Sequence, residues 1–335
     1  MSLTSALLIG RSGLAASSVG IQTTGNNLAN AATPGYSRQN VGLVPAQDGR
    51  SGNNFLGRGV EVQSVRRQID TALQGRLLGS TSSEAGASTD FTSLSTIETL
   101  LNDSSGQGLG TQLSRFFNSW SELANSPNTG GARALVVSQG RQLADYVRGL
   151  RTELVNQRTA VDRDLGTATS RVNSLLGEIA NINQAVVTAE NGITEASGLR
   201  DRRDSLISEL AQYMDVSTYE QPSGAVDIHV GSTPVVLAGS SRGVQLVSEA
   251  NGNTTNVSVQ TRDNGETLTI RSGKIGSLLG QRETTVNQTI GQLDTMAASL
   301  IDRVNKAHSV GFASQPYTTF TGTRVVGAAD QTLAF

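Results

Sequence analysis

The chain has 335 residues, of which 36% are hydrophobic and only 4% aromatic. This composition argues against a large compact core, although thin seams between helices need only two or three apolar positions in seven. The net charge of −2 includes no long run of one sign, so neither nucleic acid nor a membrane surface is an expected partner. The absence of cysteine excludes disulfides and thiolate chemistry.

Neither a membrane segment nor a cleavable signal peptide is predicted. No stretch approaches the roughly 20 apolar residues that cross a bilayer. Residues 1–5 carry no basic side chain, and the apolar run at residues 6–9 stops at Gly10 and Arg11. A cleavable signal needs a basic start and a longer apolar run, so we expect any export to use another route.

The first predicted element is a helix with a seven-residue apolar repeat. Large apolar residues recur at one position of the repeat, namely Leu7, Leu14, Ile21 and Leu28. The complementary positions are small, so they allow close helix packing but bury little area. A seven-residue period favours left-handed supercoiling against partner helices. We therefore expect this helix to be weakly stable alone and to depend on partners.

Residues 32–70 are expected to interrupt the helices. Pro34 and Gly35 form a strong turn signal, and further glycines predict an irregular stretch with short β-like runs such as residues 60–62. A helical pattern resumes near Ile69. It is expected to break again at the Gly- and Ser-rich residues 79–88.

Helical periodicity dominates residues 91–214. Aromatic and aliphatic residues between 91 and 123, including the only tryptophan, predict a hydrophobic core. Residues 154–189 keep a strict seven-residue period, which predicts a coiled-coil-like rod. Its two seams are Leu154, Val161, Ala168, Leu175 and Ile182, and Leu165, Val172, Ile179 and Val186. In a further helix at 199–214, the charged residues 200–204 are interpreted as a solvated face with local ion pairs.

Over residues 216–271 the apolar residues recur every second position, in short β-branched runs separated by Gly-containing turns, which predicts antiparallel strands. A last helix is predicted at 275–307. The predicted fold is therefore mainly α, an elongated coiled-coil-like helical bundle with a small antiparallel β insertion. We expect three parts: residues 1–83, with the N-terminal helix and an irregular linker; residues 84–312, a long-helix rod domain; and residues 313–335, the start of a further, truncated outer domain.

Residues that would support catalysis or metal binding are not grouped in this sequence. The only histidines, His229 and His308, are far apart and have no cysteine partners. No acidic pair is marked out for acid–base chemistry, and there is no phosphate-binding loop or nucleophile elbow. We therefore expect no catalytic residues, no cofactor, no metal and no enzymatic activity.

One segment carries a specific resemblance. Residues 25–39 read Gly-Asn-Asn-Leu-Ala-Asn-Ala-Ala-Thr-Pro-Gly-Tyr-Ser-Arg-Gln. They resemble the N-terminal signature of flagellar axial proteins, which include rod, hook and hook-associated subunits. Asparagine is a mediocre helix former, and nothing nearby in the sequence supplies a partner for these amides. We therefore expect them to bond neighbouring subunits and fix their register.

Further features favour one branch of that family. Ser37, Arg38 and Gln39 after the turn, the long helical block at 84–190, and the Asp-Arg-Arg-Asp-Ser-Leu-Ile-Ser-Glu-Leu segment at 201–210 resemble the hook-associated protein 1 family. The resemblance implies a secreted, extracellular structural subunit that forms the hook–filament junction. It implies self-assembly into a ring and contacts with the hook protein, with hook-associated protein 3, and with the flagellar export apparatus and its chaperone.

The resemblance also implies a subunit-interaction motif in the first helix and the turn that follows it. The residues assigned to it are Leu7, Leu14, Ile21, Asn26, Asn27, Leu28, Asn30, Thr33, Pro34, Gly35 and Tyr36. Two alternatives stay open. The chain could be another flagellar axial protein, such as a rod or hook subunit, or a coiled-coil adhesin or phage-tail component, which would share the heptads but not the Asn-rich signature.

Overall fold

The structure is a computed structural model that describes residues 3–51, 54–103, 106–190, 195–251 and 254–310. The chain divides into two compact units. Unit 1 comprises Met1–Ala87 and Thr167–Gly276, and unit 2 comprises Ser88–Gly166 and Ser277–Phe335. Each unit is thus built from two stretches that are far apart in the sequence.

Helices dominate the described residues, which confirms the predicted mainly α class. The helices are α1 (Leu3–Ala29), α2 (Thr71–Leu101), α3 (Leu109–Asn125), α4 (Gly130–Glu190), α5 (Ser197–Tyr213), α6 (Gly273–Gly280), the π-helix η1 (Gln281–Asn287) and α7 (Gln288–Ser309). None of the helices in the described ranges combines the length and hydropathy of a membrane span.

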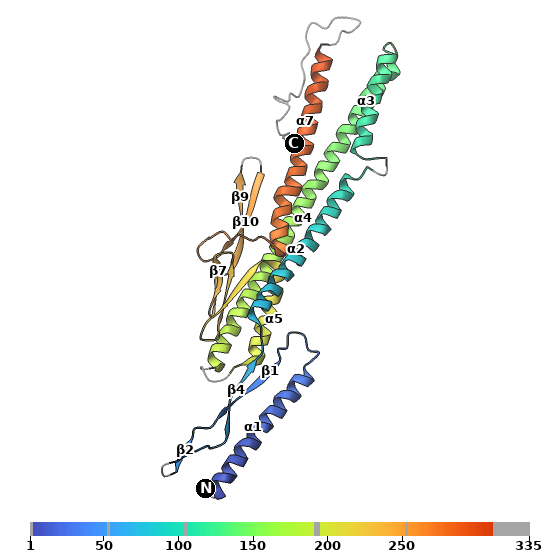
Figure 1. Cartoon of the computed structure of the whole chain (residues 1–335). Coiled ribbons are helices and arrows are strands. Elements are labelled where there is room, and N and C mark those ends of the chain that lie inside the picture. The colour runs from blue at the N-terminus through green and yellow to red at the C-terminus, as the bar shows by residue number, and fades with distance from the viewer. Residues whose placement is uncertain (1–2, 52–53, 104–105, 191–194, 252–253, 311–335) are drawn as a thin grey trace. The chain divides into compact units, whose positions relative to one another are not determined.

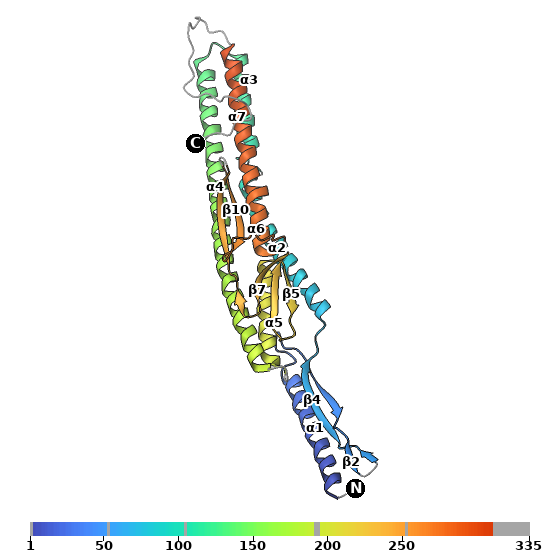
Figure 2. The ribbon, with the colours of Figure 1, turned by 90° about the vertical axis from the view of Figure 1, so that its left-hand side faces the viewer.

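The N-terminal part of unit 1 is a helix lying along a β-hairpin. Strands β1 (Gln39–Pro45) and β4 (Val60–Arg67) pair antiparallel, with a bulge between Gly42 and Leu43. A smaller hairpin joins their ends, formed by β2 (Gly49–Ser51) and β3 (Asn54–Leu56). Figures 1 and 2 both show α1 alongside β1 and β4. The predicted interruption of the helices and the β-like run at residues 60–62 agree with the structure, but the stretch is more regular than expected. Ladder pairing between segments some 20 residues apart leaves no sharp periodic signal.

The rest of unit 1 combines α5 and the second half of α4 with the predicted β insertion. Four antiparallel strands form one sheet in the order β5 (Val216–Glu220), β6 (Val226–Val230), β7 (Thr233–Leu237) and β8 (Ser240–Ser241). A second pair is formed by β9 (Val244–Asn251) and β10 (Thr254–Thr261). The predicted small antiparallel β insertion is confirmed, and its strands lie between Val216 and Thr261.

Long helices carry the core of unit 2. In both views α3, the first half of α4 and α7 run side by side (Figures 1 and 2). Their buried cluster includes Phe116, Leu143, Leu154, Val286 and Leu293, with Trp120 packed against it. The predicted aromatic core is therefore confirmed at Phe116 and Trp120, although Phe91 and Phe117 are exposed.

Burial along α4 confirms both predicted seams in the two units. All nine seam residues, Leu154, Val161, Ala168, Leu175, Ile182, Leu165, Val172, Ile179 and Val186, have relative exposures of 9% or less. Buried positions near η1 follow a different spacing, at Leu278, Arg282, Val286 and Ile290. Three successive steps of four exceed the 3.6 residues of an α-helical turn, so the wider π turn keeps these residues on one buried face.

Helix α2 passes through the Gly- and Ser-rich residues without the expected break. In unit 1, the Ser82 hydroxyl lies 2.7 Å from that of Ser272, and Gly86 lies so close to the backbone of Gly273 that an added Cβ would be 3.3 Å from its nitrogen. Close packing therefore overrides the low helix propensity of these residues. The division of the chain near residues 83 and 312 stays a prediction, and the outer domain expected at 313–335 lies outside the described residues.

Candidate assembly site at the N-terminal helix

Two opposite faces of α1 have different surroundings. Its buried residues, Ala16 and Thr23, lie on the face turned to the hairpin. Ser12 lies on the same face, where its hydroxyl accepts a hydrogen bond from the Val60 amide at 3.2 Å. Gly59 permits this approach, since it has φ +99° and a Cβ there would lie 2.1 Å from the Ser12 Oγ.

The predicted heptad residues lie on the other face. Leu7, Leu14, Ile21 and Leu28 are 66–78% exposed, and Leu3 extends the same row. We call these five residues the leucine face. A row of large apolar side chains in water is unusual for a helix that already has a packing partner. The leucine face is therefore a surface suited to contact with further helices.

The Asn-rich end of α1 is held inside its own chain. Asn27 Oδ1 accepts hydrogen bonds from the Tyr36 hydroxyl at 2.8 Å and the Gln39 amide at 2.9 Å, and its Nδ2 donates to the Gln39 carbonyl at 2.8 Å. One amide side chain thus pairs with both backbone groups of the first residue of β1. The expectation that nothing nearby supplies an intramolecular partner was wrong.

The neighbouring motif residues form the turn itself. Asn30 Nδ2 donates to the Asn26 carbonyl at 3.0 Å and to its Oδ1 at 2.9 Å, and Asn26 Nδ2 donates to the Tyr36 hydroxyl at 3.3 Å. Thr33 donates through its hydroxyl to Asn30 Oδ1 at 3.3 Å and accepts at its carbonyl from the Tyr36 amide at 3.2 Å. These bonds fix the path from α1 into β1. Asn26 is nevertheless exposed and Asn30 is half-buried.

The turn between α1 and β1 fits against α5. Pro34 lies in that turn, just beyond the end of α1. Gly35 follows with φ +78°, and a Cβ there would lie 2.8 Å from the Ser205 Oγ. Two residues further on, the Ser37 amide donates to Asp201 Oδ2 at 3.2 Å. Only glycine satisfies both the positive φ and the close approach at position 35.

A buried arginine at the end of β4 completes the attachment. The Arg67 side chain is 4% exposed; its Nη1 lies 2.8 Å from Asp201 Oδ1 and 2.7 Å from Asp204 Oδ2, and its Nε lies 3.2 Å from Glu195 Oε1. Its backbone amide also donates to Glu195, at 3.1 Å. Burial alone lowers the pKa of Arg67, but the charge of Asp204 and the hydrogen bonds to Asp201 and Asp204 outweigh it and raise the pKa.

The charged run at 200–204 is therefore largely a buried network and not a solvated face. Arg200 lies 2.6 Å from Glu190 Oε1 and 2.5 Å from Glu220 Oε1. Arg203 is 1% exposed and donates to the Gly224 carbonyl at 2.7 Å and to Asn183 Oδ1 at 3.2 Å. Desolvation lowers the pKa of Arg203. The sequence held one signal for this: residues 203, 207, 210 and 211 share one helix face, and three of them are apolar.

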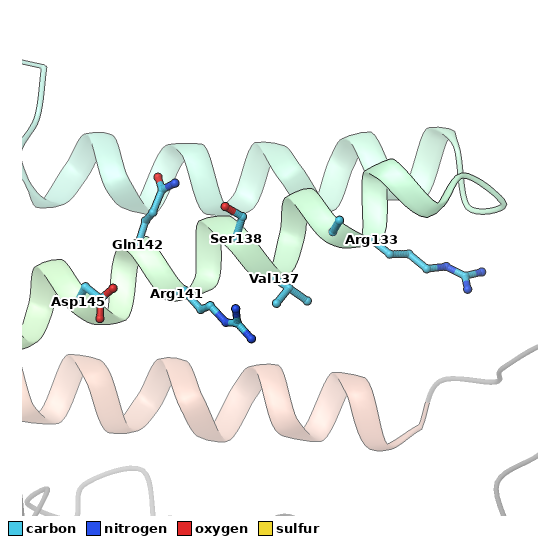
Figure 3. A pocket seen from close by; sticks show the side chains of 7 residues that line it. Arg133, Val137, Ser138, Arg141, Gln142 and Asp145 are labelled. Atoms are coloured by element: carbon cyan, nitrogen blue, oxygen red, sulfur yellow. The ribbon is translucent and has the colours of Figure 1, made fainter.

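The described residues do not form an arrangement typical of an enzyme active site. Nowhere in the described ranges do three or more His, Asp or Glu side chains gather so as to hold a metal ion. A cavity of about 500 Å³ lies along α4 in unit 2, lined by residues such as Arg133, Val137 and Arg141 (Figure 3). Its acidic member, Asp145, pairs with Arg148. The fold defines an elongated-helix protein whose first helix carries a row of exposed apolar side chains, the leucine face.

The comparisons with known proteins name the family. The chain belongs to the family described as the flagellar hook-associated protein FlgK helical domain, whose model matches residues 94–319, more than half of the chain. A second model, flagella basal body rod protein, matches residues 7–36. The predicted membership of the hook-associated protein 1 family is thereby confirmed. Every residue of the predicted interaction motif lies inside the second match.

Curated relatives agree with this assignment. The chain is 29% identical over 336 residues to flagellar hook-associated protein 1 of Bacillus subtilis (strain 168), covering 90% of this chain and 66% of the relative. It is 26% identical over 310 residues to the protein of the same name from Salmonella typhimurium (strain LT2), covering 90% of this chain and 56% of the relative. The chain thus spans between about half and two thirds of the length of these relatives.

A solved structure supports the fold. "The structure of the flagellar hook junction protein FlgK from Burkholderia pseudomallei" superposes with a TM-score of 0.62 at 21% identity, covering 69% of this chain and 43% of that chain. This likeness confirms the helical fold class.

Proposed function

We propose that the chain is a structural, non-enzymatic subunit of the bacterial flagellum that forms the hook–filament junction, on which the filament assembles. The observation that carries the proposal is the family match over residues 94–319, together with relatives that are named flagellar hook-associated protein 1. The exposed leucine face supports it, because an axial subunit needs surfaces that copies and neighbours can cover.

The same proposal names partners and location. The chain self-assembles into a ring, contacts the hook protein on one side and hook-associated protein 3 on the other, and is exported by the flagellar apparatus with its chaperone to the cell exterior. The motif from Leu7 to Tyr36 supplies the subunit contact, through the leucine face and the exposed Asn26.

Deletion of the gene tests this function. Cells lacking the protein are expected to build hooks but no filaments and to release flagellin into the medium, and the wild-type gene is expected to restore filaments. Normal filaments in the deletion strain would sink the proposal. Missing hooks would favour the alternative that the match at residues 7–36 suggests, a rod or hook subunit.

Matched variants test the interaction motif within that experiment. Leu14→Ser and Ile21→Ser remove exposed side chains from α1, whereas Leu237→Ser removes one that is 44% exposed on β7. We expect all three purified variants to melt like the wild type, and only the α1 variants to lose filaments. Full motility with both α1 variants would show that the leucine face is not an interface.

A further inference from the structure

Strand β5 has a free edge. The sheet order is β5-β6-β7-β8, so β5 pairs on one side only, and no other strand in the described part of the chain covers its second side. An edge strand presents unpaired backbone N–H and C=O groups, which are a template for an added strand. Protein partners commonly bind such edges as an extra strand.

A cavity runs along this edge within unit 1. All five residues of β5 line it, and its volume is about 520 Å³, within the usual range for binding pockets. Its other walls come from the start of α2 and from α5, with Leu78 and Ile207 as buried apolar members. Tyr219 stands at the rim, 65% exposed. We call this cavity the β5 groove.

The groove also contains a donor that lacks an acceptor. Arg203 lines it, and among the described residues the buried Nε of Arg203 has no hydrogen-bond partner; the nearest carboxylate oxygen, on Asp204, lies 3.8 Å away. An extended peptide brings carbonyl oxygens that can accept such a bond. An anion is less suitable, because five carboxylates, Glu190, Glu195, Asp201, Asp204 and Glu220, already face three arginines, Arg67, Arg200 and Arg203.

The small hairpin formed by β2 and β3 matches this groove. Phe55 lies in the extended strand β3 and is 73% exposed, although aromatic residues are scarce in this chain. Arg58 follows it and is exposed, while Glu220 at the groove is 46% exposed. An aromatic side chain buries about 150–250 Å² and pairs well across strands with an aromatic or β-branched partner.

Geometry prevents the hairpin from filling the groove of its own chain. The groove begins at Arg67, the last residue of β4, whereas the hairpin joins the first residue of β4. Eight strand residues separate these ends by about 25 Å. The connecting residues 57–59 span at most about 11 Å, so they cannot fold Phe55 back over that distance.

We propose that the hairpin of one copy docks as an added strand on the free edge of β5 in a second copy, with Phe55 seated in the β5 groove. A knob and a socket at the two ends of β4 make a head-to-tail contact, and such contacts close into rings or continue as helical arrays. This proposal rests on the proposed function only in that the chain associates with copies of itself.

Paired cysteines test the contact, since the chain contains none of its own. The double variant Gly57→Cys, Thr218→Cys places one thiol beside each element, and a Cβ at Gly57 meets only Asp48, at 3.9 Å. The two positions are too far apart in one chain for a disulfide. Oxidation of the concentrated double variant is expected to give a ladder of disulfide-linked trimers and larger species. Each single-cysteine variant has one thiol per chain, so it can form disulfide-linked dimers at most.

Phe55→Ser in the double variant is expected to reduce the ladder roughly tenfold or more, and Leu43→Ser, at a residue of β1 that is 52% exposed, is expected to leave it unchanged. Dimers alone, or a ladder indifferent to Phe55→Ser, would overturn the proposal. Protection of Thr218→Cys from a thiol reagent in dilute monomer would show that another segment fills the groove, and would overturn it too. If the protein forms the ladder but fails to restore filaments, the proposed flagellar function is wrong and the docking proposal stands. If it restores filaments but forms no ladder, the docking proposal is wrong and the proposed function stands.

Discussion

Replacing Arg67 by methionine is expected to weaken the attachment of the N-terminal helix and hairpin to α5, because it removes the guanidinium group and keeps an unbranched, apolar side chain. The substitution removes three charge contacts of 2.7–3.2 Å and leaves Glu195, Asp201 and Asp204 close together without their shared cation. Breaking a buried ion pair by removing one partner costs about 3–5 kcal/mol. The three carboxylates keep 12–18% exposure, so water relieves part of the repulsion and we expect a value near the lower end, about 3 kcal/mol.

Hydrogen exchange measures this loss where it occurs. A decrease of about 3 kcal/mol in the free energy of local opening speeds exchange of the β1 and β4 amides roughly a hundredfold. Amides of α4 and β6 are expected to change far less, because α4 and the four-stranded sheet have their own buried contacts. The Gln39 amide is the most informative single probe, since it lies beside Arg67 in the ladder.

Arg242→Met is the matched control. Arg242 also bridges two carboxylates, on Asp263 and Glu266, but these are 46% and 45% exposed. Exposed pairs of this kind contribute little to stability, because water and salt screen them. If Arg67→Met changes exchange in β1 and β4 by less than threefold, or no more than Arg242→Met does, Arg67 does not hold the N-terminal segment and the reasoning fails.

Two further predictions concern the same segment. Asn27→Ala removes three hydrogen bonds to Tyr36 and Gln39, so it is expected to destabilise the attachment of α1 to β1 by about 1–3 kcal/mol. The control Asn40→Ala, at an exposed position, is expected to change this stability little. Protease sensitivity of residues 3–45 compares the two variants; equal sensitivity would show that Asn27 is not a clamp. Gly59→Ala is expected to lower the melting temperature, because Gly59 has a positive φ and an added Cβ would clash with Ser12. Gly25→Ala is expected to raise it slightly, because Gly25 lies in a helix and an added Cβ there meets nothing within 4 Å. Calorimetry decides, and a stabilised Gly59→Ala variant would contradict the packing of α1 on the hairpin.

Periodic features of the sequence predicted the helical fold because helices are local. Along α4, the same spacing that identifies a seam at Leu165, Val172 and Ile179 also determines which residues face inward, so pattern and burial agree residue by residue. The β insertion was equally visible, because alternation is a property of a single strand. Of strands β1 and β4 only the β-like run at residues 60–62 was visible, because each strand gains its stability from a partner about twenty residues away and only half of their residues are apolar.

Contacts between distant residues were beyond this kind of reasoning. Arg67 meets carboxylates 128–137 positions away, and nothing in the charge pattern of residues 200–204 selects a partner at that distance. The Asn-rich motif shows the opposite error. Its residues were correctly singled out, but Asn27 was assigned outward because its acceptors and donors, at Tyr36 and Gln39, lie beyond a turn whose geometry the sequence does not specify.

The two faces of α1 give the N-terminal segment separate tasks. Bonds that involve Asn27, Ser12 and Arg67 connect the segment to the rest of its own chain. The leucine face is left over, and burying Leu7, Leu14, Ile21 and Leu28 fully would contribute about 6–12 kcal/mol. Association costs about 4–15 kcal/mol in lost freedom, so one such contact is marginal between two copies. The same contact becomes decisive when each copy touches several neighbours at once, because the cost is then shared among contacts that form together. The N-terminal segment is thus bonded within its own chain and presents one weakly adhesive face. This suits a subunit that associates within an array and not in dilute solution.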